Sequence, residues 1–145
     1  MPREHGSSML ELIVVLAVVA IFAAVAVPGA SRARATVAGS EGARRLALVL
    51  RAAQAEAESG SGAVRVMIEP DGDFVVTDAD GSTAMSGRLG TAVTSTYPGN
   101  VLEFTERGWA RLPGSSSPRA GHFTVAGAAQ SRTVVVQLSG CVRCG

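Results

Sequence analysis

The chain has 145 residues, about one domain's worth, and its formal net charge of +1 argues against a general nucleic-acid-binding surface. Hydrophobic residues make up 47% of it but aromatic residues only 4%. Because much of the apolar content falls near the N-terminus, we expect the remainder to form a small core. The two histidines, His5 and His122, suggest no Ser-His-Asp arrangement, so the composition favours neither an enzyme nor a bound cofactor.

An apolar segment begins near the N-terminus. Residues 12–27 contain no polar residue, and the two apolar residues before Glu11 extend the run close to the ~20 residues that a helix needs to cross a bilayer. We therefore expect residues 9–27 to contact membrane lipid. The one interruption is Glu11. A carboxylate near the bilayer core costs about 2.5–3.5 kcal/mol on insertion scales, so we expect Glu11 to have a positively charged partner.

Three interpretations fit such a segment. A secretory signal peptide would be cut after a small residue, and Ala24-Val25-Ala26 offers a site, but the length of the run and Glu11 both count against it. A plain signal anchor would tolerate the length and would give Glu11 no role. The third interpretation accounts at once for the glycine before the run, the acid within it and the proline after it.

Residues Gly6 to Pro28 resemble the prepilin-type processing and methylation segment of type IV pilins and type II secretion pseudopilins. The resemblance implies that prepilin peptidase cuts between Gly6 and Ser7 and that the new amine of Ser7 is methylated. It also implies that Glu11, the fifth residue of the trimmed chain, pairs with the amino terminus of a neighbouring subunit during assembly. Ser7 departs from the pattern, because Phe or Met usually follows the cut.

Residue types on both sides of the run suit this assignment. Gly6 has no side chain to obstruct a peptidase, and Pro28 lacks a backbone donor, so we expect a kink where the assembly helix leaves the membrane. The distribution of arginines around the run favours the opposite orientation in the membrane. Four arginines follow the run within 32–45 and only Arg3 precedes it, which by the positive-inside rule would keep the C-terminal part in the cytoplasm. Because the processing motif is the more specific signal, we expect that part in the periplasm.

A second helical stretch is predicted from Pro28 to about Ser59. Apolar residues recur there at spacings of three and four, which predicts one narrow buried stripe. The Ser-Gly alternation at 59–62 is expected to end the helix. The stripe consists of Leu46, Val49, Leu50, Ala53 and Ala57.

The rest of the chain predicts short antiparallel strands. Apolar residues at 64, 66 and 68 alternate with Arg65, Met67 and Glu69, and a turn at 70–72 leads into an apolar run at 74–76. Further strands are expected at 101–105, 109–112, 122–126 and 133–138.

This part of the chain is similar to the H-type minor pseudopilins of type II secretion, which share a domain with minor pilins of type IV pili. The similarity rests on the segments 102–108, 134–138 and 139–143. It implies an α+β, pilin-like fold, in which a long N-terminal helix, transmembrane in its first half, packs on small antiparallel β-sheets. The expected divisions are a leader peptide at 1–6, a transmembrane assembly helix at 7–28, its periplasmic continuation at 29–60 and an antiparallel β head domain at 61–145.

Two other clusters have simpler explanations than a bound ion. Cys141 and Cys144 form a C-x-x-C pair without enough further ligands for zinc, and outside the cytoplasm such a pair favours a local disulfide. Aspartates at 71, 73, 78 and 80 lack the glycine and glutamate spacing of a calcium loop, and hairpin turns explain them. We therefore expect no metal site.

The resemblance implies a minor pseudopilin of the type II protein secretion system. Such a subunit is anchored in the inner membrane with its head in the periplasm, and an inner-membrane platform assembles it with other pseudopilins. Two alternatives stay open: a minor pilin of a type IV pilus acting in pilus assembly or DNA uptake, and a secreted protein cut near Ala26. DNA-binding relatives carry paired arginines near the C-terminus, whereas only Arg143 lies there, so nucleic acid is not an expected partner.

Overall fold

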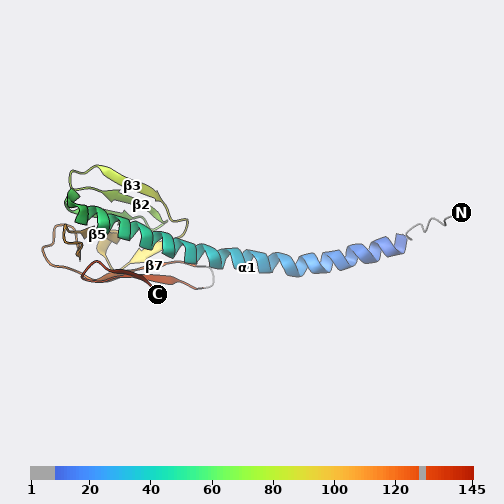
Figure 1. The fold of residues 1–145 in the computed structure, drawn as a ribbon. Coiled ribbons are helices and arrows are strands. Elements are labelled where there is room, and N and C mark those ends of the chain that lie inside the picture. Colours follow the sequence, from blue (N-terminus) through green and yellow to red (C-terminus); the bar gives the residue numbers. More distant parts are fainter. Residues whose placement is uncertain (1–8, 128–129) are drawn as a thin grey trace. The chain divides into compact units, whose positions relative to one another are not determined.

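The computed structural model describes residues 9–127 and 130–145, without the side chains of 10, 25–36, 38 and 61. The chain divides into two compact units, Met1–Arg34 and Ala35–Gly145. The described part contains one long helix, α1 (Met9–Glu56), followed by nine strands (Figure 1). The strands are β1 (Val64–Ile68), β2 (Asp73–Thr77), β3 (Thr83–Arg88), β4 (Val93–Ser95), β5 (Val101–Phe104), β6 (Ala110–Arg111), β7 (Gly121–Val125), β8 (Arg132–Val136) and β9 (Val142–Cys144).

The end of α1 lies where glycine allows the backbone to turn. A π-helical turn follows the helix at Ala57–Ser61, and within it Gly60 has a φ of +96°. A residue with a Cβ would be strained at this angle, so the Ser-Gly alternation stops the helix, as predicted. The buried stripe before this point is confirmed as well. Its five members, Leu46, Val49, Leu50, Ala53 and Ala57, are all buried.

The strands form two antiparallel sheets. A five-stranded sheet has the order β3-β2-β1-β5-β6, and a four-stranded sheet has the order β4-β7-β8-β9. In the middle of the first sheet, Val66 pairs with Val76 on one side and Leu102 on the other, so three buried side chains lie in a row across it. The side chains of β1 alternate between buried and exposed, which confirms the strand predicted from its period of two.

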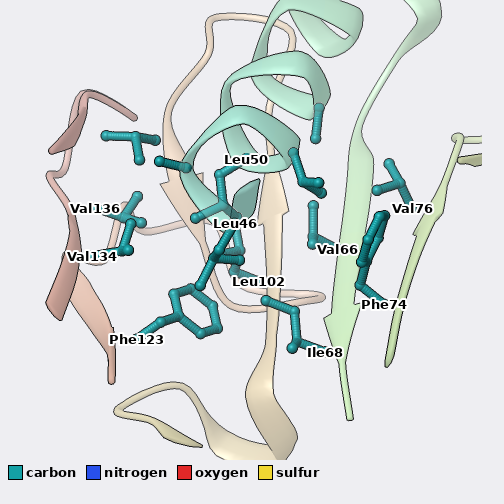
Figure 2. Packing of buried hydrophobic residues seen from close by; sticks show 14 of the residues in the cluster. Leu46, Leu50, Val66, Ile68, Phe74, Val76, Leu102, Phe123, Val134 and Val136 are labelled. Carbon is teal, nitrogen blue, oxygen red and sulfur yellow. The ribbon is translucent and has the colours of Figure 1, made fainter. Parts of the chain in front are cut away.

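One hydrophobic core lies within Ala35–Gly145. Figure 2 shows Leu46 and Leu50 of α1 between side chains of β1 and β2 on one side and side chains of β7 and β8 on the other. Tyr97 adds an aromatic contact, with its ring centroid 5.5 Å from that of Phe123. The helix is therefore part of the same core as both sheets, because its buried stripe faces each of them.

The predicted architecture, a long N-terminal helix with small antiparallel sheets, is confirmed. Three strands were not predicted: β3, β4 and β9. All six residues of β3 are exposed, so this strand has no buried side chains to produce an alternating pattern. The other two have three residues each, which is too short for a period of two to be recognised.

Candidate functional site

The first part of α1 presents an exposed apolar surface. Every side chain that the structure describes from 9 to 24 is exposed, and the large apolar ones are 45–86% exposed. A helix that is apolar on all sides is typical of one buried in a large core or in a membrane. This segment therefore needs other apolar groups to cover it, either lipid or neighbouring helices.

Glu11 lies at the start of this surface. Its side chain is exposed and belongs to the first turn of α1. From Met9 to Ser31 it is the only charged residue of the sequence. The unbonded N–H groups of a first helical turn carry partial positive charge, which favours a carboxylate there. Once apolar groups cover the segment, the same carboxylate also needs a full positive charge nearby to offset its desolvation.

The other predicted processing and assembly residues are only partly visible. Gly6 and Ser7 lie outside the described residues, so the cleavage site stays a prediction. α1 is helical without a break through Pro28, whose side chain is not among those described, and the kink expected there stays a prediction too. Within the described residues, none of the helices combines the length and the hydropathy needed to cross a membrane.

A buried carboxylate lies between two arginines on the five-stranded sheet. Glu103 is 6% exposed, although strand alternation directs it away from the core that its neighbours Leu102 and Phe104 enter. The register places Arg65 of β1 and Arg111 of β6 directly opposite it. Arg111 donates from Nε to Glu103 Oε1 at 2.8 Å, and Arg65 Nη2 lies 3.4 Å from Oε2. One carboxylate therefore links three strands, a role that the sequence shows only once the register is known.

A cavity of about 380 Å³ adjoins this cluster. Two guanidinium groups, of Arg65 and Arg111, and two carboxylates, of Glu103 and Asp78, are among its lining. Asp78 Oδ2 accepts a hydrogen bond from the Ser82 hydroxyl at 3.3 Å, whereas Oδ1 is buried without a hydrogen-bond partner in the part of the chain that the structure describes. The formal charges of these four lining groups balance.

Asp71 and Asp80 stabilise turns, and Asp73 forms an ion pair with Arg88 between β2 and β3. Asp71 accepts from the backbone N–H of Asp73 at 3.3 Å, and Asp80 accepts from that of Ser82 at 2.9 Å. The hydrogen bond from Ser82 lowers the pKa of Asp80, and the hydrogen bond from Arg88 lowers that of Asp73. Across 9–127 and 130–145, no group of three His, Cys, Asp or Glu side chains could hold a metal ion.

The two cysteines lie at the C-terminal edge of the four-stranded sheet. Cys144 belongs to β9, and Cys141 immediately precedes it. Both are exposed free thiols in this structure, so the disulfide stays a prediction. The Cys144 thiol donates to the carbonyl oxygen of Ala43 in α1, with Sγ 3.9 Å from that oxygen.

The single tryptophan lies at the turn between β5 and β6. Trp109 is 42% exposed, and the guanidinium carbon of Arg107 lies 5.6 Å from the centroid of its ring. A cation over an aromatic face is held by the ring's quadrupole. The sequence places Trp109 on a strand but gives no sign of this contact, because it depends on the turn at Gly108, whose φ is +73°.

Comparison with known proteins bears on the N-terminal segment first. Residues 1–27 match the prokaryotic N-terminal methylation motif. The matched range includes Glu11 and the predicted cleavage site, and a motif of this kind indicates a membrane-anchored protein. No curated protein sequence is significantly similar to the chain.

Solved structures with a similar fold include two crystal forms of a minor pilin and one structure of a minor pseudopilin. The type IV minor pilin FimU of Pseudomonas aeruginosa strain PAO1 is 21% identical in one crystal form, where the match covers 73% of this chain and 91% of FimU with a TM-score of 0.56. In a second crystal form FimU is 20% identical, and the match covers 74% of this chain and 87% of FimU with a TM-score of 0.57. The minor pseudopilin EpsH from the Type 2 Secretion System of Vibrio cholerae is 15% identical, covering 74% of this chain and 95% of EpsH with a TM-score of 0.55. At such identities the likeness concerns the fold, and it confirms the predicted pilin-like architecture.

Proposed function

We propose that this chain, which carries the prokaryotic N-terminal methylation motif and the fold of minor pilins and pseudopilins, is a membrane-anchored subunit of a pilus-like filament and not an enzyme. The observation that carries the proposal is the exposed apolar start of α1 with Glu11 in its first turn. A surface of this kind is suited to two environments in succession, lipid before assembly and neighbouring helices after it.

The proposed assembly begins with the cut between Gly6 and Ser7 by prepilin peptidase. The cut frees the amine of Ser7, which is then methylated. In the filament, Glu11 pairs with the Ser7 amine of a neighbouring subunit. Opposite charges attract strongly where water is excluded, but this attraction offsets desolvation only when the geometry is good, so the pair sets the register of packing more than the stability of the filament.

The machine that we propose is the type II protein secretion system, in which the chain acts as a minor pseudopilin. It spans the inner membrane once, through residues 9–27, with its C-terminal domain in the periplasm and an inner-membrane platform as assembly partner. A minor pilin of a type IV pilus, acting in pilus assembly or DNA uptake, is the second candidate, and the similarity to FimU favours it. Purifying the full chain in detergent from its native cells distinguishes the two, because pseudopilins co-purify in the first case and type IV pilins in the second.

Glu11→Leu tests the proposed assembly role. The variant should reach the membrane at the wild-type level, since leucine suits lipid better than a carboxylate, but it should lose most of its co-purification with other filament subunits. Glu41→Leu is the matched control, because Glu41 is an exposed acid of the same helix whose ion-pair contact, with Arg45 at 4.0 Å, is local. Normal co-purification of the Glu11→Leu chain would contradict the proposal.

Mass spectrometry of the native protein tests the processing step independently. The expected chain begins at Ser7 and carries one methyl group on its amine. A chain that keeps residues 1–6, or one that begins beyond the apolar segment, would overturn the assignment. The second result would favour the secreted protein cut near Ala26.

A further inference from the structure

The C-x-x-C pair is the one motif that filament assembly leaves without a role. β9 is the last strand of the four-stranded sheet, and among the described residues it pairs with β8 alone. Its pairs are Val134 with Cys144, Val135 with Arg143 and Val136 with Val142. The pairing geometry extends to Cys141, whose carbonyl oxygen accepts from the backbone N–H of Gln137 at 3.0 Å. The segment from Cys141 to Cys144 is therefore extended along its whole length.

An extended segment keeps these two thiols apart. Successive side chains of a strand point to opposite faces, so Cys144 shares the face of buried Val142, and Cys141 lies on the other face. The contact of Cys144 with Ala43 of α1 agrees with this assignment. Three residues of strand span about 10 Å between Cα atoms, whereas a disulfide needs about 4.4–6.8 Å. The two sulfurs cannot bond while β9 remains paired.

Several contacts hold β9 in this position. Arg51 of α1 donates from Nη2 to the carbonyl oxygen of Val142 at 3.0 Å. The backbone N–H of Gly145 donates to the carbonyl oxygen of Thr133 at 2.8 Å. The side chain of Val142 is 4% exposed and belongs to the core. Each of these contacts would be lost if the segment turned tightly enough to bring the two thiols together.

We propose that pairing of β9 with β8 and a disulfide between Cys141 and Cys144 exclude each other, so that the thiol pair is a redox-controlled latch on the C-terminal strand. In the reduced chain β9 closes the sheet. On oxidation, the two thiols lose two protons and two electrons as the sulfur–sulfur bond forms, and a disulfide-bearing oxidant accepts them and becomes two thiols. The oxidised chain releases β9 and leaves the edge of β8 unpaired.

Hydrogen exchange on the full chain in detergent tests this latch, with oxidised glutathione as the oxidant. The expected product has an internal disulfide, and its amides at 142–145 and in β8 exchange much faster than in the reduced chain. Cys141→Ser, which cannot form the bond, should keep slow exchange under the same treatment. An internal disulfide with unchanged protection of β9 would overturn the proposal. The proposal would also be overturned if the native chain formed only mixed disulfides with glutathione, while the same chain in urea formed the disulfide between Cys141 and Cys144.

The rate of disulfide formation provides a second test. Arg51→Gln removes a contact that holds β9 and leaves both cysteines in place, so the segment should open more often. If the lost hydrogen bond contributes about 1 kcal/mol, the disulfide should form roughly five times faster than in the unsubstituted chain. Arg44→Gln is the matched control, because Arg44 is an exposed arginine of the same helix that makes no hydrogen bond to β9 within the described part of the chain. The latch would be contradicted if the disulfide formed at equal rates in the two variants while circular dichroism showed that both chains are folded.

Discussion

Glu103 is stabilised by charge and by position together. Its side chain is buried, and the guanidinium groups of Arg65 and Arg111 cover it from the two neighbouring strands. A buried carboxylate without such partners would be strongly unfavourable. The two arginines lie on either side of Glu103, so its negative charge also reduces the repulsion between their guanidinium groups.

Removing this carboxylate should destabilise the folded chain. For Glu103→Ala we expect a loss of about 1–3 kcal/mol in the free energy of unfolding, since the partly buried guanidinium group of Arg111 and the exposed one of Arg65 both lose their acceptor. Urea denaturation measures this as a lower midpoint with an unchanged slope. Glu106→Ala, at an exposed site two residues beyond β5, should change stability by less than about 0.5 kcal/mol. Equal effects of the two substitutions would show that the shared carboxylate contributes nothing.

The hydroxyl of Tyr97 should titrate well above its ordinary range. Burial raises its pKa to about 12, although the positive charge of Arg119 opposes the shift in part. The pKa of Tyr97 in the folded chain is above its unfolded value of ~10. The stability that the neutral phenol contributes is therefore complete below the unfolded pKa and is lost as pH rises through the folded pKa. Tyr97 is the only tyrosine, so phenolate absorbance reports it alone. We expect a midpoint near pH 12 for the folded chain and near 10 in urea; a folded midpoint near 10 would contradict its burial.

Two turns meet at the scale of secondary-structure elements, and glycine makes the contact between them possible. Gly140, in the turn between β8 and β9, has a φ of +81°, and a Cβ there would lie 1.8 Å from the carbonyl oxygen of Gly108. Gly108 belongs to the turn between β5 and β6. The two sheets therefore approach each other here through backbone, without room for a side chain.

Gly140→Ala should destabilise the fold through this contact. Gly114→Ala is its matched control, because Gly114 also has a positive φ, +73°, but apart from its chain neighbours no atom of the described residues lies within 4 Å of the position of its Cβ. Both substitutions incur the ~1–2 kcal/mol of left-handed backbone strain, and only the first adds a clash with backbone. We expect Gly140→Ala to cost about 1–3 kcal/mol more than Gly114→Ala in urea denaturation. Equal costs would mean that the turns can move apart freely.

Elements long enough for their buried side chains to repeat in a regular pattern were predictable from sequence, and wholly exposed or very short elements were not. β1 alternates buried and exposed residues, and the helical stripe recurs at three and four, so both patterns reflect the core that they enter. β3 is wholly exposed and is held by its backbone pairing with β2, which leaves no trace in the hydropathy of its side chains. The burial of Glu103 depends on which strands are neighbours, and strand order is not a local property of sequence.

For the molecule as a whole, the candidate site and the core belong to different parts of the chain. The N-terminal methylation motif could be recognised from sequence because it is local and has a fixed spacing from Gly6 to Glu11. The core residues all lie between Ala43 and Val142, within the unit Ala35–Gly145. The stability of the head should therefore not depend on the residues that we propose anchor and assemble it.

Deleting residues 1–34 tests this independence. The shortened chain should fold cooperatively, with a urea midpoint within about 10–15% of that of the full chain in the same detergent, because no core residue is removed. Circular dichroism and denaturation of both chains measure it. Loss of a cooperative transition in the shortened chain would mean that the apolar segment contributes to folding of the head.

The sharing of one acid by two bases also restricts the order in which evolution can replace them. If Arg111 is substituted first, Glu103 still has Arg65; if Glu103 is substituted first, two like charges face each other across β5. Well-packed apolar residues can replace a buried ionic group without loss of stability once all of its members have gone. Among related chains, ancestors that lost an arginine before the glutamate should therefore outnumber those that lost the glutamate first.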